Sequence, residues 1–332
     1  MFIVPIKSWH FLQSDHCWLE EFSKGNYVNV ENCNNCGHRV TAFANISCLN
    51  GEQGMSVAEC SVCGHIQKSR KPSREANSTH FRDKWLKNRQ DRKFSPNDNT
   101  FRLLDKYFKE PGTVLEIGCG SGTNLAPFQV AGWKTFGFDP SVSEIEIAKE
   151  QGIQNVKVDT AESYWSEIQQ KFDLIFMRDV LQFIDKPYDT VSRYLPFLKQ
   201  NGIFMTTNGN FRNNNIIMSC HHGTIPNHPT LTALKHWCSQ NKLQVKEESE
   251  HPAMIIAQKT DLETELFQPT GLTNWHAEIK KATFASFPMN LISGRRRINK
   301  FRSVNVENVR DVPGSFQIEF QYDLQHPPVV MK

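Results

Sequence analysis

The feature that most constrains the fold is the segment from Val114 to Thr123, which reads VLEIGCGSGT. An apolar run comes first, then glycines at alternate positions (Gly118, Gly120 and Gly122), and then a helical pattern from about Asn124. Glycine in such a turn permits positive φ and lets a ligand approach the backbone closely. The order of strand, glycine loop and helix is typical of cofactor-binding α/β domains, although dinucleotide enzymes use similar loops.

The pattern around this loop alternates between strand and helix. Strands are expected at 113–117, 134–139, 156–159, 172–177, 202–207 and 254–258, and helices from about 124 and at 143–150, 187–199 and 230–241. This alternation predicts a mainly parallel sheet that helices cover on both faces. Helical spacing is also present in 101–108, and the alternating run 315–322 predicts an exposed strand.

Three details distinguish the loop from a dinucleotide-binding loop. Glu116 lies inside the strand, two residues before Gly118, the glycines follow the spacing G-x-G-x-G, and Asp139 ends the next strand. With these residues the chain resembles the class I methyltransferases that use S-adenosylmethionine (SAM), whose first motif has the form E-x-G-x-G-x-G. The resemblance covers about residues 101–260 and implies a Rossmann-like core with a mainly parallel seven-stranded sheet. An inert Rossmann domain or a dinucleotide enzyme remains the alternative.

The resemblance also implies which residues hold the cofactor. In that family the acid that ends the second strand binds the ribose hydroxyls, and the acid that ends the third strand faces the adenine amine; Asp139 and Asp159 stand in these places. Many relatives carry histidine where this chain has Gln182, and Asp173 is interpreted as structural. The implied cofactor-binding residues are Glu116, Gly118, Cys119 (a small loop residue), Gly120, Gly122, Asp139, Asp159 and Arg178.

Four of the nine cysteines form two copies of the motif C-x-x-C-G-H, at Cys33–His38 and Cys60–His65. The odd number of cysteines and their scatter argue against a disulfide framework. Paired thiolates at this spacing predict a closed, structural Zn²⁺ site with Cys33, Cys36, Cys60 and Cys63 as ligands. Free thiols and an iron–sulfur cluster are the alternatives. His38 and His65 are expected outside the ligand set.

These motifs suggest four segments. We expect a zinc-ribbon-like module in residues 1–67, a basic helical linker in 68–110, the methyltransferase core in 111–260 and an extension in 261–332 that could bind substrate. Between Lys68 and Lys93 there are ten Lys or Arg against three Asp or Glu, and a second basic run is Arg295–Arg297. Both suit either a solvated surface or contact with phosphates.

Methyl transfer requires an aligned acceptor and a group that removes its proton. The candidate bases follow the fourth and fifth strands, at the edge where α/β proteins bind ligands. They are Asp179, His221, His222 and His228, with the pair His221 and His222 favoured, while Asn208 and Asn210 could line the pocket by position. No Asn/Asp-Pro-Pro-Tyr run and no Pro-Cys nucleophile follows the fourth strand, which argues against the usual routes of nucleobase methylation.

The layout of a four-cysteine module, linker helices and this core resembles methyltransferases that act on sugars and polysaccharide precursors. We therefore expect methyl transfer to an oxygen or carbon of a sugar, free or nucleotide-linked, or of a similar small metabolite. One alternative is an RNA methyltransferase that docks through the zinc module and basic linker, and another is a SAM-binding module without catalysis. With no apolar run long enough to span a bilayer and no signal-peptide pattern at its start, the chain is expected in the cytoplasm.

Overall fold

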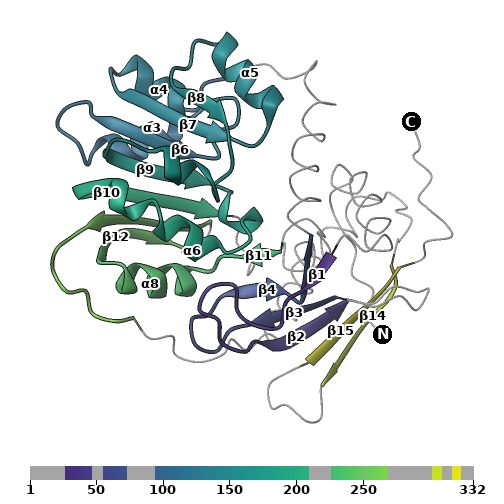
Figure 1. Cartoon of the computed structure of the whole chain (residues 1–332). Helices are drawn as coiled ribbons and strands as arrows, with labels where there is room; N and C mark the ends of the chain where they lie inside the picture. The colour runs from purple at the N-terminus through teal and green to yellow at the C-terminus, as the bar shows by residue number, and fades with distance from the viewer. Residues whose placement is uncertain are drawn as a thin grey trace, which may run out of the picture. The chain divides into compact units, whose positions relative to one another are not determined.

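The computed structural model describes residues 27–46, 55–72, 94–208, 226–250, 252–267, 301–308 and 316–322. The chain divides into two compact units, each of which is described by itself (Figure 1). The core unit comprises residues 74–209 and 229–268. The cysteine unit comprises residues 1–73, 210–228 and 269–332, so the chain returns to it twice after the core has begun.

The core unit is built on a seven-stranded sheet with the order β12-β13-β10-β9-β6-β7-β8. The five strands from β10 to β8 are parallel to one another, whereas β13 is antiparallel to both β10 and β12. The strands are β6 (Thr113–Ile117), β7 (Lys134–Asp139), β8 (Val156–Val158), β9 (Phe172–Arg178), β10 (Leu198–Asn208), β12 (Leu243–Ser249) and β13 (Ala253–Lys259). The six strands expected from the sequence are all present.

Helices cover both faces of this sheet, and each face has its own apolar core. Adjacent strand residues alternate between the two: Leu115 packs with α6 and α8, whereas Val114 packs with α3, α4 and α5. Burial on both sides explains why the central strands are nearly continuous apolar runs. The helices are α3 (Asn99–Asp105), α4 (Leu125–Val130), α5 (Val142–Glu150), α6 (Pro187–Ser192) and α8 (Leu231–Gln240), with 3₁₀ turns η2 (Tyr164–Glu167), η3 (Leu181–Phe183) and η4 (Leu195–Phe197).

Two elements differ from the sequence-based expectation. The single helix expected at 187–199 ends at Ser192 and is followed by the turn η4. Pro196 lies in that turn; it lacks the N–H that would donate to Ser192 O, and its ring would collide with that carbonyl in a continuous α-helix, which explains the break. Strand β12 was not expected, because its exposed side chains at every second position make it a polar edge strand with little apolar signal.

The cysteine unit contains a four-stranded sheet with the order β11-β4-β3-β2, whose neighbouring strands are antiparallel. Its strands are β2 (Thr41–Ile46), β3 (Met55–Glu59), β4 (Ile66–Lys68) and β11 (Asn227–His228). Strand β1 (Tyr27–Asn29) pairs with β5 (Arg70–Pro72), so the beginning of the predicted helical linker is extended. A further hairpin joins β14 (Phe301–Asn308) to β15 (Phe316–Tyr322), the latter being the strand predicted at 315–322.

Within the part of the chain that the structure describes, no helix has both the length and the apolar character that crossing a bilayer requires.

Candidate functional site

The glycine loop follows β6 at the carboxyl edge of the parallel strands, as the sequence predicts. Gly118, Gly120 and Gly122 all have positive φ, of 70°, 51° and 77°. A Cβ atom at Gly118 would lie 2.5 Å from a methyl carbon of Val180, whereas at Gly120 the nearest atom, Glu144 Oε2, would be 3.6 Å away. The loop therefore needs glycine for conformation at both positions and, at Gly118, also for space.

The side chain of Cys119 is buried, although neighbouring residues of the loop are partly exposed. It is buried in the α3/α4/α5 core, and its backbone N–H donates to Phe138 O at 3.0 Å. A side chain at Gly137 would lie 2.9 Å from Cys119 Sγ, so the glycine in β7 makes room for the thiol. Cys119 thus offers a ligand its backbone at most, in keeping with its interpretation as a small loop residue.

Glu116 is 1% exposed and lies below the glycine loop. Its Oε1 accepts a hydrogen bond from Asn124 Nδ2 at 2.8 Å, while Oε2 has no hydrogen-bond partner among the described residues. Burial raises the pKa of Glu116 to about 8 and the charge of Asp139 adds to it, against the opposing effects of the Asn124 amide and the Arg178 guanidinium. A buried carboxyl oxygen without a partner is costly unless a ligand supplies a donor.

Arg178 belongs to the same polar network at the end of β9. Its Nη1 donates to Thr100 Oγ1 at 3.0 Å and to Asn124 Oδ1 at 3.3 Å. Asn97 Nδ2 also donates to Asn124 Oδ1, at 3.1 Å. The sequence did not single out Asn97, Thr100 or Asn124. Asn124 could have been found as the polar residue that begins the helix after the loop, but the other two depend on how α3 packs.

Asp139 and Asp159 lie at the ends of neighbouring strands, where the sequence placed them. Asp139 accepts hydrogen bonds from the backbone N–H of Gly120 at 3.0 Å and of Ser141 at 2.9 Å. Burial raises the pKa of Asp139 to about 6 despite these two bonds. Asp159 N–H donates to Asp139 O at 3.1 Å, which holds the two acids at one edge. Because each carboxylate oxygen can accept more than one hydrogen bond, capacity remains for hydroxyl or amine donors.

Asp173 occupies the opposite, amino edge of the sheet. Its Oδ2 accepts from the N–H and hydroxyl of Thr113 and from Lys199 Nζ, each at 2.8 Å. Burial alone would raise its pKa, but Lys199 and Thr113 hold the pKa of Asp173 below its usual value. These contacts join β6, β9 and β10, which agrees with the structural interpretation of Asp173.

Two of the residues proposed to face the acceptor lie at the carboxyl edge. Asp179 is exposed directly after β9, with a φ of 55°, and its N–H donates to Thr207 O at 2.7 Å. Asn208 ends β10; its Nδ2 donates to Thr206 Oγ1 at 3.1 Å, and its buried Oδ1 has no partner among the described residues. This edge therefore carries polar groups on two adjacent strands.

The histidine candidates are placed differently. His221, His222 and Asn210 lie outside the described residues. His228 is buried in β11, where it pairs with Ile66 of β4, so it is a strand residue of the cysteine unit.

The four motif cysteines come together as the sequence predicts. Their sulfur atoms all lie within 4.8 Å of one another, with Cys33 and Cys63 3.6 Å apart and Cys36 and Cys60 3.4 Å apart. None of the four forms a disulfide. A tetrahedron of thiolates around Zn²⁺, with Zn–S near 2.3 Å, requires sulfur separations of about 3.8 Å. The donor set and its spacing fit a thiophilic divalent cation, and no open ligand position is left for substrate.

The two cysteine turns have the same backbone conformation. Gly37 N–H donates to Cys33 O at 2.9 Å, and Gly64 N–H donates to Cys60 O at 2.8 Å. Both glycines have positive φ, 76° and 71°. The glycine after the second cysteine therefore closes each turn.

The histidines that end the two motifs differ in environment: His38 is exposed and His65 is fully buried. Burial lowers the pKa of His65 to about 4, so its ring is neutral. Neither histidine belongs to the sulfur cluster, in line with the expectation that both lie outside the ligand set.

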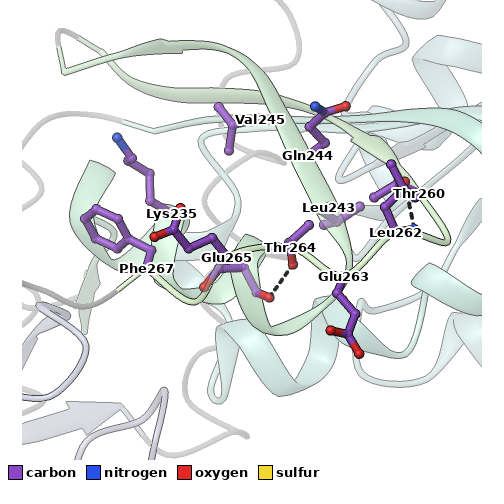
Figure 2. Close-up of a pocket in the computed structure, with 11 residues that line it drawn as sticks. Lys235, Leu243, Gln244, Val245, Thr260, Leu262, Glu263, Thr264, Glu265 and Phe267 are labelled. Carbon is purple, nitrogen blue, oxygen red and sulfur yellow. Dashed lines mark hydrogen bonds between the residues drawn. The ribbon is translucent and has the colours of Figure 1, made fainter.

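A separate cavity of about 290 Å³ lies in the core unit between α8, the beginning of β12 and residues 260–267 (Figure 2). Leu243, which begins β12, pairs with Lys259 at the end of β13, next to Gln258, which pairs with Ile203 of β10. Ile203 in turn pairs with Leu174 near the beginning of β9. The cavity is therefore at the amino edge of the sheet, away from the glycine loop. Its wall includes Thr264, whose hydroxyl donates to Ser239 O at 2.7 Å.

Comparison with known proteins agrees with this geometry. Residues 85–248 match the family model described as a methyltransferase domain. Over 126 residues the chain is 28% identical to a ubiquinone biosynthesis O-methyltransferase of Rhodopseudomonas palustris (strain TIE-1). The aligned segment is 36% of this chain and 48% of that protein. It is also 29% identical over 108 residues to a ribosomal protein L11 methyltransferase of Dictyoglomus thermophilum, 32% of this chain and 35% of that one. The chain thus spans about half or less of the curated relatives it matches.

Among solved structures, the magnesium protoporphyrin IX methyltransferase of Synechocystis PCC 6803 with bound SAH covers 55% of this chain and 96% of its own, at 14% identity and a TM-score of 0.44. The match to the family model coincides with the segment that holds the glycine loop, Glu116, Asp139 and the parallel strands. Residues 85–248 of the chain therefore resemble a methyltransferase domain.

Proposed function

We propose that the protein transfers a methyl group from SAM to an oxygen or carbon of a sugar or similar small metabolite. The observation that carries the SAM part is the carboxyl of Glu116, buried beside the glycine loop with Oε2 unpartnered among the described residues. SAM ends in an α-ammonium group, which has the donors that this oxygen lacks. Bound SAM would supply an already activated methyl group on its sulfonium.

The chain's own residues would then divide the remaining work. Gly118, Gly120 and Gly122 would let the methionine part approach the backbone, and Asp139 and Asp159 would accept hydrogen bonds from the ribose and the adenine amine. Cys119 would contribute its backbone, and Arg178 would hold Asn124 and stabilise the ionised form of Glu116. We propose Asp179, His221 and His222 as candidates for removing the acceptor's proton, a step that suits groups titrating near neutral pH.

We further propose that Cys33, Cys36, Cys60 and Cys63 hold a structural Zn²⁺. Four sulfur ligands close the coordination sphere, so the metal would stabilise the turns and take no part in methyl transfer. The support is the clustering of the four sulfur atoms in the cysteine unit.

Calorimetric titration with SAM and S-adenosylhomocysteine tests the cofactor part, with the wild type compared with Asp139→Ala and Asp139→Asn. We expect binding by the wild type and a loss of about 1–3 kcal/mol in the alanine variant, because the ribose hydroxyls and two backbone N–H groups lose their acceptor. The asparagine variant, which keeps one oxygen, should lose less. A folded wild type that binds neither compound would contradict the proposal and favour a module without catalysis.

The acceptor class requires a second experiment, in which methyl transfer to sugars, nucleotide-linked sugars and RNA is measured at several salt concentrations. If the rate of methyl transfer to a sugar does not change with salt concentration, the proposal is supported. Binding to RNA whose affinity falls steeply with salt would favour the RNA alternative instead. For each phosphate contact, the logarithm of the affinity should then fall by about 0.7–0.9 per tenfold increase in salt concentration. Within the basic segment, the Lys68 side chain is buried in β4 and is therefore not available to a phosphate group.

A further inference from the structure

The two C-x-x-C-G-H motifs are alike in sequence and in backbone, yet only one of their histidines is buried. The difference arises from β11, a two-residue strand that pairs with β4 beside the second motif. Asn227 of β11 is fully buried, and its Oδ1 lies 3.2 Å from Nε2 of His65. This distance suits a hydrogen bond donated by the ring in its Nε2–H form.

The same oxygen also contacts the first motif. Asn34, which follows Cys33, donates from Nδ2 to Asn227 Oδ1 at 2.9 Å. One carbonyl oxygen can accept both hydrogen bonds, so Asn227 joins a residue of each cysteine turn. Asn227 is separated from Asn34 by 193 positions in the sequence and from His65 by 162.

Gln67, the partner of Asn227 in the β4–β11 register, strengthens this connection. Its Oε1 accepts from Asn34 N–H at 2.6 Å, and its Nε2 donates to Asn32 O at 2.8 Å. The backbone continues the pairing, because Lys68 N–H donates to Pro226 O at 2.9 Å. Strand β11 is therefore held by a buried polar network that requires both cysteine turns to be in place.

Strand β11 lies in the connection between β10 and α8, so the network that holds β11 also holds this connection. The chain leaves the core at the end of β10, at the carboxyl edge, and re-enters it at α8, which Thr230 caps by accepting from Ala233 N–H at 3.0 Å. Only Pro229 separates His228 of β11 from this cap. The strand that the cysteine turns hold is thus the last element before the chain returns to the core.

We infer that the four-cysteine centre anchors the connection between β10 and α8, with Asn227 as the residue that couples metal binding to the docking of β11. A metal ion that fixes the four sulfur atoms also fixes Asn34 and His65, which present the two donors to Asn227. Because coupling between two binding events is reciprocal, β11 in turn strengthens metal binding by the same factor. The inference rests on the proposed metal and is independent of the proposed methyl transfer.

The first test measures zinc affinity on the full-length protein by competition with a chromogenic chelator. Asn227→Ala and His65→Ala should each weaken zinc binding roughly tenfold, a typical effect of removing an outer contact of a metal site. His38→Ala is the matched control: it removes the equivalent histidine of the other motif, which is exposed, and should leave the affinity unchanged. Wild-type affinity in a folded Asn227→Ala protein would overturn the inference.

A second measurement needs no variant and so does not depend on whether the substitutions fold. Hydrogen exchange in peptides covering 226–234 is compared for the wild type with zinc and after chelation. We expect exchange to accelerate on metal removal in β11 and in the first turn of α8, while β6 in the core stays protected. Unchanged exchange in β11 would contradict the coupling. A wild type that holds no zinc would overturn the inference, whereas SAM binding by that same sample would leave the proposed methyl transfer intact.

Discussion

At the scale of single residues, the ionisation of Glu116 gives the proposed cofactor site a measurable signature. With a pKa raised to about 8 by burial, Glu116 is mainly protonated in the free protein near neutral pH. An adjacent ammonium group favours the charged carboxylate, so SAM binding should expel a proton, and the apparent affinity should rise with pH up to about 8. Calorimetry at neutral pH in buffers of different ionisation enthalpy should show release of close to one proton.

Two controls identify the source of that proton. 5′-Methylthioadenosine, which lacks the amino-acid part of SAM, should bind without releasing it. Glu116→Gln should abolish the release and weaken SAM binding, because the amide is neutral at every pH. If the glutamine variant still expels a proton on binding SAM, another group is the source, and Asp139, with its pKa raised to about 6, is the first to examine.

The sequence predicted the residues of this site better than their connections. Glu116, the three glycines and Asp139 could be placed because each belongs to a motif of fixed spacing around one strand. Thr100 and Asn97 were missed because their link to Arg178 and Asn124 depends on tertiary packing of α3. Aromatic contacts place that helix, such as Phe101 on Phe128 with ring centroids 5.1 Å apart, and no local pattern encodes them.

At the scale of elements, the turn between β6 and α4 separates two requirements for glycine. Gly118→Ala should destabilise the core by roughly 2 kcal/mol, because a left-handed conformation costs about 1–2 kcal/mol and the new methyl would collide with Val180. Gly120→Ala has the same backbone penalty without that collision, so its unfolding free energy should fall by about 1 kcal/mol. Denaturant unfolding of the two variants checks this order.

The same pair of variants tests whether the loop faces a ligand. Gly120→Ala should weaken SAM binding by more than its loss of stability suggests, because its methyl group adds bulk where the proposed cofactor approaches. Full SAM affinity in a folded Gly120→Ala protein would show that the cofactor does not approach the backbone at this position.

Element boundaries were predictable where one structural rule dominated. The buried strands β6 and β7 have the predicted bounds because both faces are covered and their apolar runs end in the glycine loop and in Asp139. The helix expected at 187–199 was too long because Pro196 interrupts an otherwise helical pattern. Strand β11 was not predictable, since a pair of residues has no period and its place depends on β4, far away in the sequence.

At the scale of the whole molecule, the two units differ in what holds them together. The core unit has two extensive apolar clusters, one on each face of its sheet. Among the described residues, the cluster around the cysteine turns consists of the four cysteines with Val40 and Val62. A structural zinc site contributes directly to the folding of the module that holds it. The structure therefore predicts that zinc and SAM stabilise different units.

Differential scanning calorimetry can resolve this division in the full-length protein. We expect two unfolding transitions with zinc present. SAM should raise the midpoint temperature of one of them by mass action, and chelation of the zinc should abolish the other. Cys63→Ser should reproduce the effect of chelation, because it removes a sulfur ligand from the centre. Cys238 is a buried thiol in α8, so Cys238→Ser should lower the midpoint temperature of the SAM-responsive transition alone. A single transition that responds equally to SAM and to chelator would show instead that the units unfold together, so that the coupling through β11 extends over the whole protein.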